Sequence, residues 1–315
     1  MSRRLALWLL LSAAPAFAEA PPRDEWRREL GGHVFVPSLA VADPFLSTFF
    51  SLDAGAGYSW IDGPGYDLRG NLVGKNNYVA EALALDGTFQ ASVTSWLAVR
   101  AAGSGGLNGG SDGRSALVVG AVEPITLGAG LTASWRLARV VRVGGTFDFS
   151  YTHLKLVQPV EAVRSSLAVG QVDNGAISQR IDAYAVQPGA AVAYAPHPMI
   201  GLLGSAQYLW RGYFGDAPGV NRSYIVLGVG AELDLRPRFP RVPVGFLLAY
   251  RTQIPFESEA RFTHTLEGGV FYTGRRAIDL GVDLQLRWFD LRPDARIPLD
   301  TLQLVSVFLL RYHWN

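Results

Sequence analysis

The chain has 315 residues, of which 49% are hydrophobic, and it carries 28 Lys+Arg against 27 Asp+Glu and no cysteine. This balance excludes the clustered basic excess that nucleic-acid-binding proteins use to recognise phosphates, so no nucleic acid is expected as a partner. The lack of cysteine excludes disulfides, thiol catalysis and cysteine-ligated metal ions.

The first 18 residues have the pattern of a secretory signal peptide. Arg3 and Arg4 precede the apolar run from Leu5 to Leu11, and the small-residue motif Ala16-Phe17-Ala18 follows. The apolar run is far short of the roughly 20 residues that a spanning helix needs. We therefore expect export and cleavage after Ala18.

The segment that follows, residues 19–48, precedes any strand pattern. Its part from 31 to 47 is apolar but contains Pro37 and Pro44, which suit neither an interior sheet strand nor a solvated tail. We expect these residues to be sheltered by the structure that the rest of the chain builds.

From residue 49 onward, apolar and polar residues alternate in run after run. In one of them, Ile278, Leu280 and Val282 alternate with Asp279, Gly281 and Asp283, which is the period of a β-strand. The alternation predicts twelve strands, near residues 49–61, 79–93, 97–104, 124–135, 141–155, 182–194, 200–213, 222–235, 243–253, 262–273, 277–289 and 301–314. Most exceed the roughly 9–11 residues that a tilted strand needs to cross a bilayer.

Each strand presents one aliphatic face and one polar face. The charged face needs water or partners, as a hydrated lumen provides, while the aliphatic face needs lipid. The fold class predicted is all-β, a transmembrane antiparallel up-and-down β-barrel of about twelve strands over residues 49–315, in the outer membrane of a Gram-negative bacterium.

The predicted connections alternate between short and long. The short ones would face the periplasm, together with both chain ends. Two of the longer ones, 105–123 and 156–181, contain the segments 111–122 and 157–170, which have features of short helices and are equally compatible with ordinary extracellular loops.

Aromatic residues fall near both ends of the predicted strands, as expected at membrane interfaces. On this basis Tyr78 and Tyr224 are predicted to belong to the outer girdle. The tryptophans expected at the interfaces are Trp60, Trp96, Trp135, Trp210, Trp288 and Trp314.

The strand register also predicts which residues line the lumen. These are Asp53, Asp86, Arg100, Arg142, Asp148, Gln207, Arg211, Glu232, Asp234, Arg251, Glu267, Asp279, Asp283, Arg287 and Arg311. The list contains both positive and negative side chains. Two interpretations are therefore open: buried ion pairs that stiffen the barrel, or a lining that selects solutes. No preference for cations or anions is predicted.

About twelve strands leave a narrow lumen, which the apolar 31–47 segment could fill. We expect it to fold inward as a plug, with Phe35, Pro37, Asp43, Pro44 and Phe45 as its principal residues.

The motifs His33-Val34-Phe35-Val36-Pro37-Ser38 and Asp43-Pro44-Phe45, ahead of a glycine-rich first strand, resemble those of FadL-like outer-membrane transporters, including relatives named for the meta-pathway of phenol degradation. The resemblance implies uptake of small hydrophobic compounds with the N-terminal segment as a hatch. The final strand, with Phe308, Leu310, Tyr312 and Trp314 on one face, resembles the signal read by the barrel-assembly machinery, although Asn315 follows the last aromatic.

Together these features predict a passive outer-membrane channel for small, hydrophobic molecules, whose partners are outer-membrane lipids, the barrel-assembly machinery and a small-molecule substrate. The alternative is a closed structural or surface-interaction barrel. No histidine has a serine two residues after it, the spacing used by outer-membrane lipid hydrolases, and the five histidines lack ligand-like pairing. We expect no enzyme activity, no catalytic residues, no cofactor and no metal.

Overall fold

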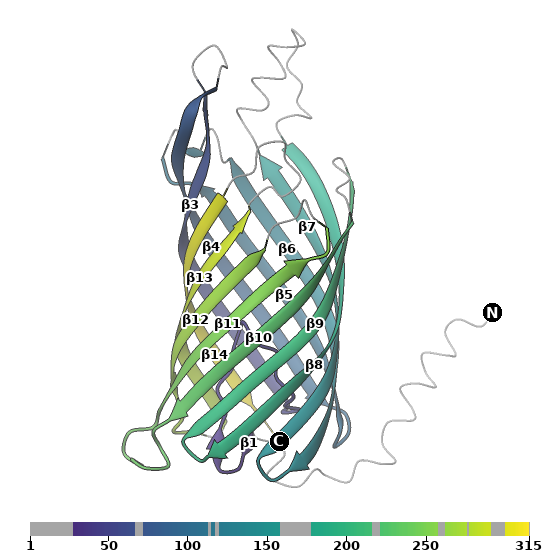
Figure 1. The fold of residues 1–315 in the computed structure, drawn as a ribbon, viewed down its shortest axis with the longest axis vertical. Helices are drawn as coiled ribbons and strands as arrows, with labels where there is room; N and C mark the ends of the chain where they lie inside the picture. Colours follow the sequence, from purple (N-terminus) through teal and green to yellow (C-terminus); the bar gives the residue numbers. More distant parts are fainter. Residues whose placement is uncertain are drawn as a thin grey trace, which may run out of the picture.

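The computed structural model describes residues 28–66, 72–112, 115–116, 120–157, 178–215, 221–257, 262–275, 277–290 and 300–314. In this part of the chain, twelve strands close into one barrel that surrounds an N-terminal segment (Figure 1). The predicted signal peptide, residues 1–18, lies outside the described residues.

The barrel strands follow one another in chain order. Their bounds are β3 (Phe49–Tyr66), β4 (Leu72–Ser92), β5 (Leu97–Gly110), β6 (Ala121–Ala138), β7 (Val141–Val157), β8 (Ser178–His197), β9 (Ile200–Gly215), β10 (Arg222–Asp234), β11 (Val244–Pro255), β12 (Thr263–Tyr272), β13 (Ile278–Asp290) and β14 (Asp300–His313). All twelve predicted strands are confirmed.

Every strand pairs antiparallel with its neighbours in sequence, and β14 closes the barrel by pairing with β3 along 14 residue pairs, from Asp300↔Asp62 to His313↔Phe49. Closure leaves no unpaired strand edge in the wall, as the apolar interior of a membrane requires. The predicted up-and-down topology is therefore confirmed.

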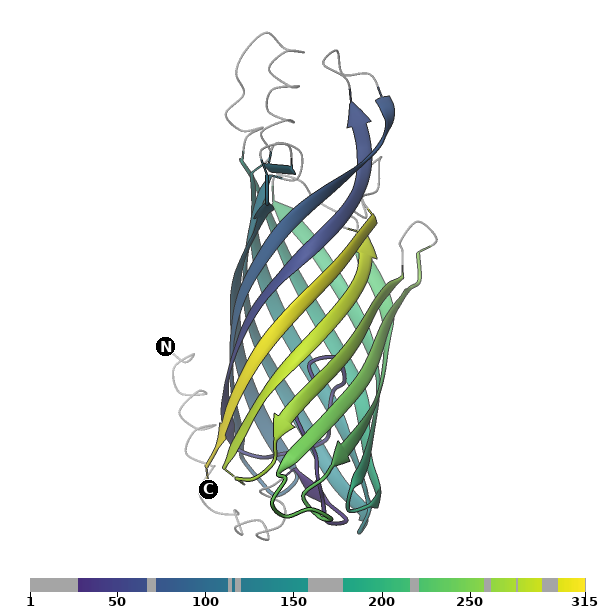
Figure 2. The same ribbon diagram turned by 90° about the vertical axis from the view of Figure 1, so that its left-hand side faces the viewer.

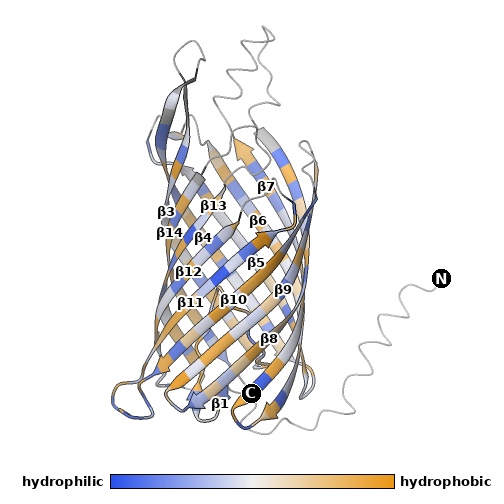
Figure 3. Ribbon diagram, in the orientation of Figure 1, coloured by the Kyte–Doolittle hydropathy of each residue, from blue (hydrophilic) through white to orange (hydrophobic). Residues whose placement is uncertain are grey.

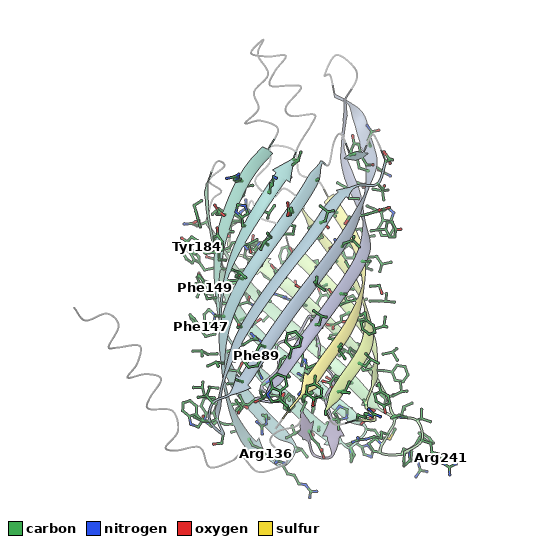
Figure 4. All side chains as sticks on the ribbon, turned by 180° about the vertical axis from the view of Figure 1, so that it is seen from behind. Phe89, Arg136, Phe147, Phe149, Tyr184 and Arg241 are labelled. Atoms are coloured by element: carbon green, nitrogen blue, oxygen red, sulfur yellow. The ribbon has the colours of Figure 1, made fainter. Side chains whose placement is uncertain are left out.

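One end of the barrel carries short turns and the C-terminus, and we call it the turn end; the opposite end is the loop end (Figure 1). In outer-membrane barrels the short turns face the periplasm. Arg136 and Arg241 lie at this end (Figure 4).

Hydrophobic and hydrophilic residues alternate along the barrel strands, as the colouring in Figure 3 shows. On β13, Leu280, Val282 and Leu284 are exposed on the outer surface, whereas Asp283 and Gln285 are buried inside. Phe89, Phe147 and Phe149 likewise stand on the outer wall (Figure 4). Among the described residues, no helix has the length and apolarity that crossing a bilayer requires.

The aromatic residues follow the same register. Trp60, Trp96, Trp135, Trp288 and Trp314 are exposed on the outer surface, and Trp210 packs edge-on against Tyr184 with the ring centroids 5.2 Å apart. Tyr78 and Tyr224, which we had assigned to the outer girdle, are instead buried. They share the inward parity of Ala80 and Val226, so proximity to a strand end was a poorer guide than register.

The strands of the first hairpin extend well beyond their predicted ends, and β3 reaches Tyr66 where Ile61 was expected. In the 111–122 connection, Asp112 caps a helical turn, because its Oδ1 accepts the Ser115 N–H at 2.8 Å and its carbonyl accepts the Ala116 N–H at 2.7 Å. Most of this turn, and residues 158–170 of the 157–170 segment, lie outside the described residues.

Candidate channel lumen and its N-terminal plug

The first described residues form a small hairpin at the turn end, made of β1 (Glu29–Leu30) and β2 (His33–Val34). Its two-residue turn, Gly31-Gly32, has positive φ at both positions, 60° and 89°, which a side chain would strain. The chain then rises into the lumen and returns to begin β3, as the purple trace inside the barrel shows (Figure 2). We call residues 28–47 the plug.

The rising leg of the plug is held from both sides. The Glu232 carboxylate of β10 accepts the Val36 N–H at 2.8 Å and lies 3.4 Å from His33 Nε2. Arg28 donates to the Phe35 carbonyl at 3.2 Å and to the Val36 carbonyl at 2.7 Å. These bonds satisfy backbone groups that have no sheet partner here.

The apex of the plug is held by one buried carboxylate, Glu267 of β12. It accepts the Leu39 N–H and the Ala40 N–H, each at 2.8 Å, and the Ser38 hydroxyl at 2.7 Å. Ser38 Oγ in turn accepts the Val41 N–H at 3.0 Å and so closes a tight turn. The two oxygens of this carboxyl group thus accept three hydrogen bonds from the plug.

The descending leg is tied to the wall by Gln90 of β4, whose amide donates to the Phe45 and Ser47 carbonyls at 3.1 and 3.0 Å. The two legs are joined by an ion pair between Arg28 and Asp43. Burial would raise the pKa of the Asp43 carboxyl, but Coulombic attraction to Arg28 and Arg311 outweighs it, and the pKa lies below its ordinary value. Asp43 therefore stays ionised at neutral pH.

Apolar packing accompanies these bonds. One cluster joins plug and wall, and consists of Leu30, Phe35, Val36, Ala40, Val41 and Phe45 with Ala193, Ala195, Leu203, Leu247, Ala249, Phe271 and Leu309. The Phe45 ring also lies close to two guanidinium groups, with its centroid 5.4 Å from Arg28 Cζ and 5.8 Å from Arg142 Cζ.

Glycine lets the plug approach the wall closely. A Cβ at Gly201 of β9 would lie 2.3 Å from His33 Nε2 and 2.8 Å from Phe35 Cε1, both far inside contact distance. The plug position thus depends on a missing side chain in the wall.

All five residues predicted for the plug lie in it: Phe35, Pro37, Pro44 and Phe45 are buried and Asp43 is half-buried. Sequence reasoning missed Arg28, which bonds to both legs. An arginine ahead of an apolar, proline-containing segment was the available signal.

The residues predicted to line the lumen all take inward positions, and most are paired. Arg100 forms an ion pair with Asp148, Asp279 lies 2.8 Å from His313, and Asp234 accepts the Thr273 hydroxyl at 3.0 Å. Gln207 accepts a bond from Gln187 at 2.7 Å. Arg311 stacks on Phe49 with its Cζ 4.0 Å from the ring centroid.

Above the plug apex the lumen opens into two adjoining cavities. The larger, about 560 Å³, is bounded by β3 to β6, β13 and β14 and includes Asp53 and Asp86. The smaller, about 340 Å³, is bounded by β9 to β14 and includes Arg211 and Arg251. Leu39 and Arg287 belong to both, so the cavities meet at the apex. A third space of about 220 Å³ surrounds the plug itself.

No group of three or more potential metal ligands occurs among the residues that the structure describes. No protein-family model matches the chain, and no curated protein matches it by sequence.

The fold is similar to several solved structures. A Pseudomonas aeruginosa FadL homologue matches with a TM-score of 0.50 and 11% identity, over 93% of this chain and 98% of that one. An outer membrane channel from Pseudomonas putida F1 matches with a TM-score of 0.51 and 12% identity, over 89% of this chain and all of that one. The translocator domain of the autotransporter NalP from Neisseria meningitidis has a TM-score of 0.47 and 8% identity, over 85% and 89%.

The chain therefore has the fold of an outer-membrane β-barrel, and this fold is similar to that of a FadL homologue, in line with the resemblance of residues 33–45.

Proposed function

We propose that the chain is an outer-membrane channel through which small, mainly hydrophobic molecules pass passively, and that residues 28–47 are a plug that must move for passage. One observation carries the proposal: an apolar-walled cavity lies directly above the plug apex, inside a barrel of a kind whose lumen is usually polar.

The apolar wall is formed by inward positions that carry small aliphatic side chains. Ala80 and Ala82 of β4 and Val305 and Val307 of β14 all line the 560 Å³ cavity. These positions would normally hold polar residues that face water. An apolar solute gains from contact with such a wall in proportion to the apolar area it buries.

The plug is compatible with movement because its polar attachments to the wall come from separate side chains rather than from a sheet. Glu232, Glu267 and Gln90 accept or donate individual bonds, while β1 and β2 pair only with each other. Such hydrogen bonds contribute about 0.5–1.5 kcal/mol each between neutral groups and about 1.5–3 kcal/mol each to charged groups, so each single attachment is weak enough to break. The names of two similar folds, a FadL homologue and an outer membrane channel, agree with this proposal.

The experiment compares the wild type with a variant that lacks residues 31–47. Both are purified and recorded in planar bilayers, and both are expressed in cells whose uptake of the neutral dye N-phenyl-1-naphthylamine is followed by fluorescence. We expect larger conductance steps after the deletion, and faster dye uptake than in cells with the empty vector. Silence of both proteins, with uptake at the vector level, would favour the alternative, a closed structural barrel whose lower lumen is filled by its own chain.

A further inference from the structure

We propose that Arg211 and Arg251, with Arg287 beside them, form a binding site for a compact organic anion whose carboxylate lies in the 340 Å³ cavity and whose apolar body lies in the 560 Å³ cavity. The proposal rests on the function proposed above and narrows its substrate class.

The strand register brings two of these arginines into one row of the wall. Arg251 of β11 pairs with Thr265 of β12, which pairs with Arg287 of β13. The row continues through Gln303 of β14. Arg211 of β9 lines the same cavity, and both Arg211 and Arg287 are close enough to Arg251 to repel its charge.

Negative charge is absent from the described lining of this cavity, whose other polar members are tyrosine, threonine and glutamine side chains. Within the described part of the chain, neither Arg211 nor Arg251 has an ion pair, and Arg251 Nε is buried without a hydrogen bond. Arg287 donates to Gln285 Oε1 at 3.0 Å and also feels the charges of Asp86, Glu267 and Asp283.

Two other arginines that face the lumen differ in this respect. Arg28 is paired with Asp43 and Arg100 with Asp148. Holding guanidinium groups together at partly buried positions is costly unless an anion offsets their charge. A carboxylate fits because guanidinium groups donate to it in a planar, paired geometry.

Gln285 helps to position one of these arginines. It is 1% exposed and lines the cavity, and its Oε1 accepts the bond from Arg287. Its amide group lies beside the Asp283 carboxylate of the same strand. Gln285 therefore holds the Arg287 guanidinium at the cavity wall.

The size and position of the apolar half define the rest of the ligand. The two cavities share Leu39, Arg287, Phe289 and Gln303, so one molecule can occupy both. A volume of about 560 Å³ accommodates a compact ring system. The floor is Leu39, at the apex of the plug, so a bound anion would touch the element that must move.

The test measures binding of 2-naphthoate and of its neutral counterpart 2-naphthamide to the purified full-length barrel by isothermal titration calorimetry. We expect 2-naphthoate to bind about ten-fold more tightly, because hydrogen bonds to charged groups are the stronger ones. R251Q and R211Q should each remove most of that difference and leave 2-naphthamide unaffected. Arg241→Gln, in an exposed turn at the other end of the barrel, is the matched control and should change nothing.

Folding of each variant is checked by heat-modifiable electrophoretic mobility, and R211Q alone suffices if R251Q does not fold. Equal affinity for the two probes, or a charge preference that survives in the folded variants, would overturn the anion site while leaving the hydrophobic channel standing. Binding of neither probe, together with dye uptake at the vector level, would overturn both.

Discussion

The two halves of the lumen treat inward charge in opposite ways. In the turn-end half, the carboxylates of Glu232 and Glu267 accept hydrogen bonds from backbone N–H groups of the plug. The plug therefore supplies hydrogen-bond partners for these buried wall residues. In the loop-end half, Arg211 and Arg251 face a cavity with no carboxylate in its described lining. This difference supports our proposal that the plug closes the lower half and that a solute binds in the upper half.

The largest expected effect comes from removing the carboxylate at the plug apex. Glu267→Ala would leave the buried N–H groups of Leu39 and Ala40 without their acceptor, at a cost of about 1–3 kcal/mol each. We expect the plug to leave the lumen more often and the frequency of channel openings in planar bilayers to rise by an order of magnitude or more.

The matched control for this change is Asp148→Ala, which removes an inward carboxylate that pairs with Arg100 in the wall. Its opening frequency should stay near that of the wild type. Equal opening frequencies in the two variants would show that Glu267 does not hold the plug.

A smaller effect is expected from crowding the rising leg. In Gly201→Ala, the new Cβ would overlap His33 and Phe35, and overpacking of this kind costs about 1–3 kcal/mol in total. The opening frequency should rise less than in Glu267→Ala, and the midpoint of thermal unfolding should fall.

Gly105→Ala provides the comparison in the upper half, because a Cβ there would meet no atom within 4 Å. It should leave both the opening frequency and the unfolding midpoint unchanged. If the two alanine variants behave alike, close packing between plug and wall is not what keeps the lumen closed.

Much of the fold could be predicted because a membrane imposes a period of two on every strand. Whether a residue such as Leu280 or Asp283 faces outward or inward follows from its odd or even position along the strand, and all twelve strands were predicted from this alternation. The extension of β3 to Tyr66 was missed because Gly63, Pro64 and Gly65 read as a loop, although backbone pairing with β4 continues there.

The organisation of the site was harder to predict. Pro37 and Pro44 marked the plug, because they exclude its segment from a sheet. The clustering of Arg251 and Arg287 depends on the register between strands whose paired residues are about 36 positions apart in the sequence. A list of inward charges shows that both signs occur, but it does not show which residues become neighbours. The hydrogen bonds of Glu232 and Glu267 to the plug backbone were likewise not predictable, because the plug segment has no periodic pattern from which its path could be inferred.

The central claim is that the plug moves to open the lumen, and a reversible tether tests it most directly. A Cβ at Gly228 would lie 3.3 Å from Val41 Cγ2, and the chain has no other cysteine, so V41C/G228C should form one unambiguous disulfide. Planar-bilayer recordings would be made on the oxidised protein and again after dithiothreitol. Our account predicts that openings are absent while the disulfide is intact and return on reduction. Openings of equal size and frequency before and after reduction would contradict it.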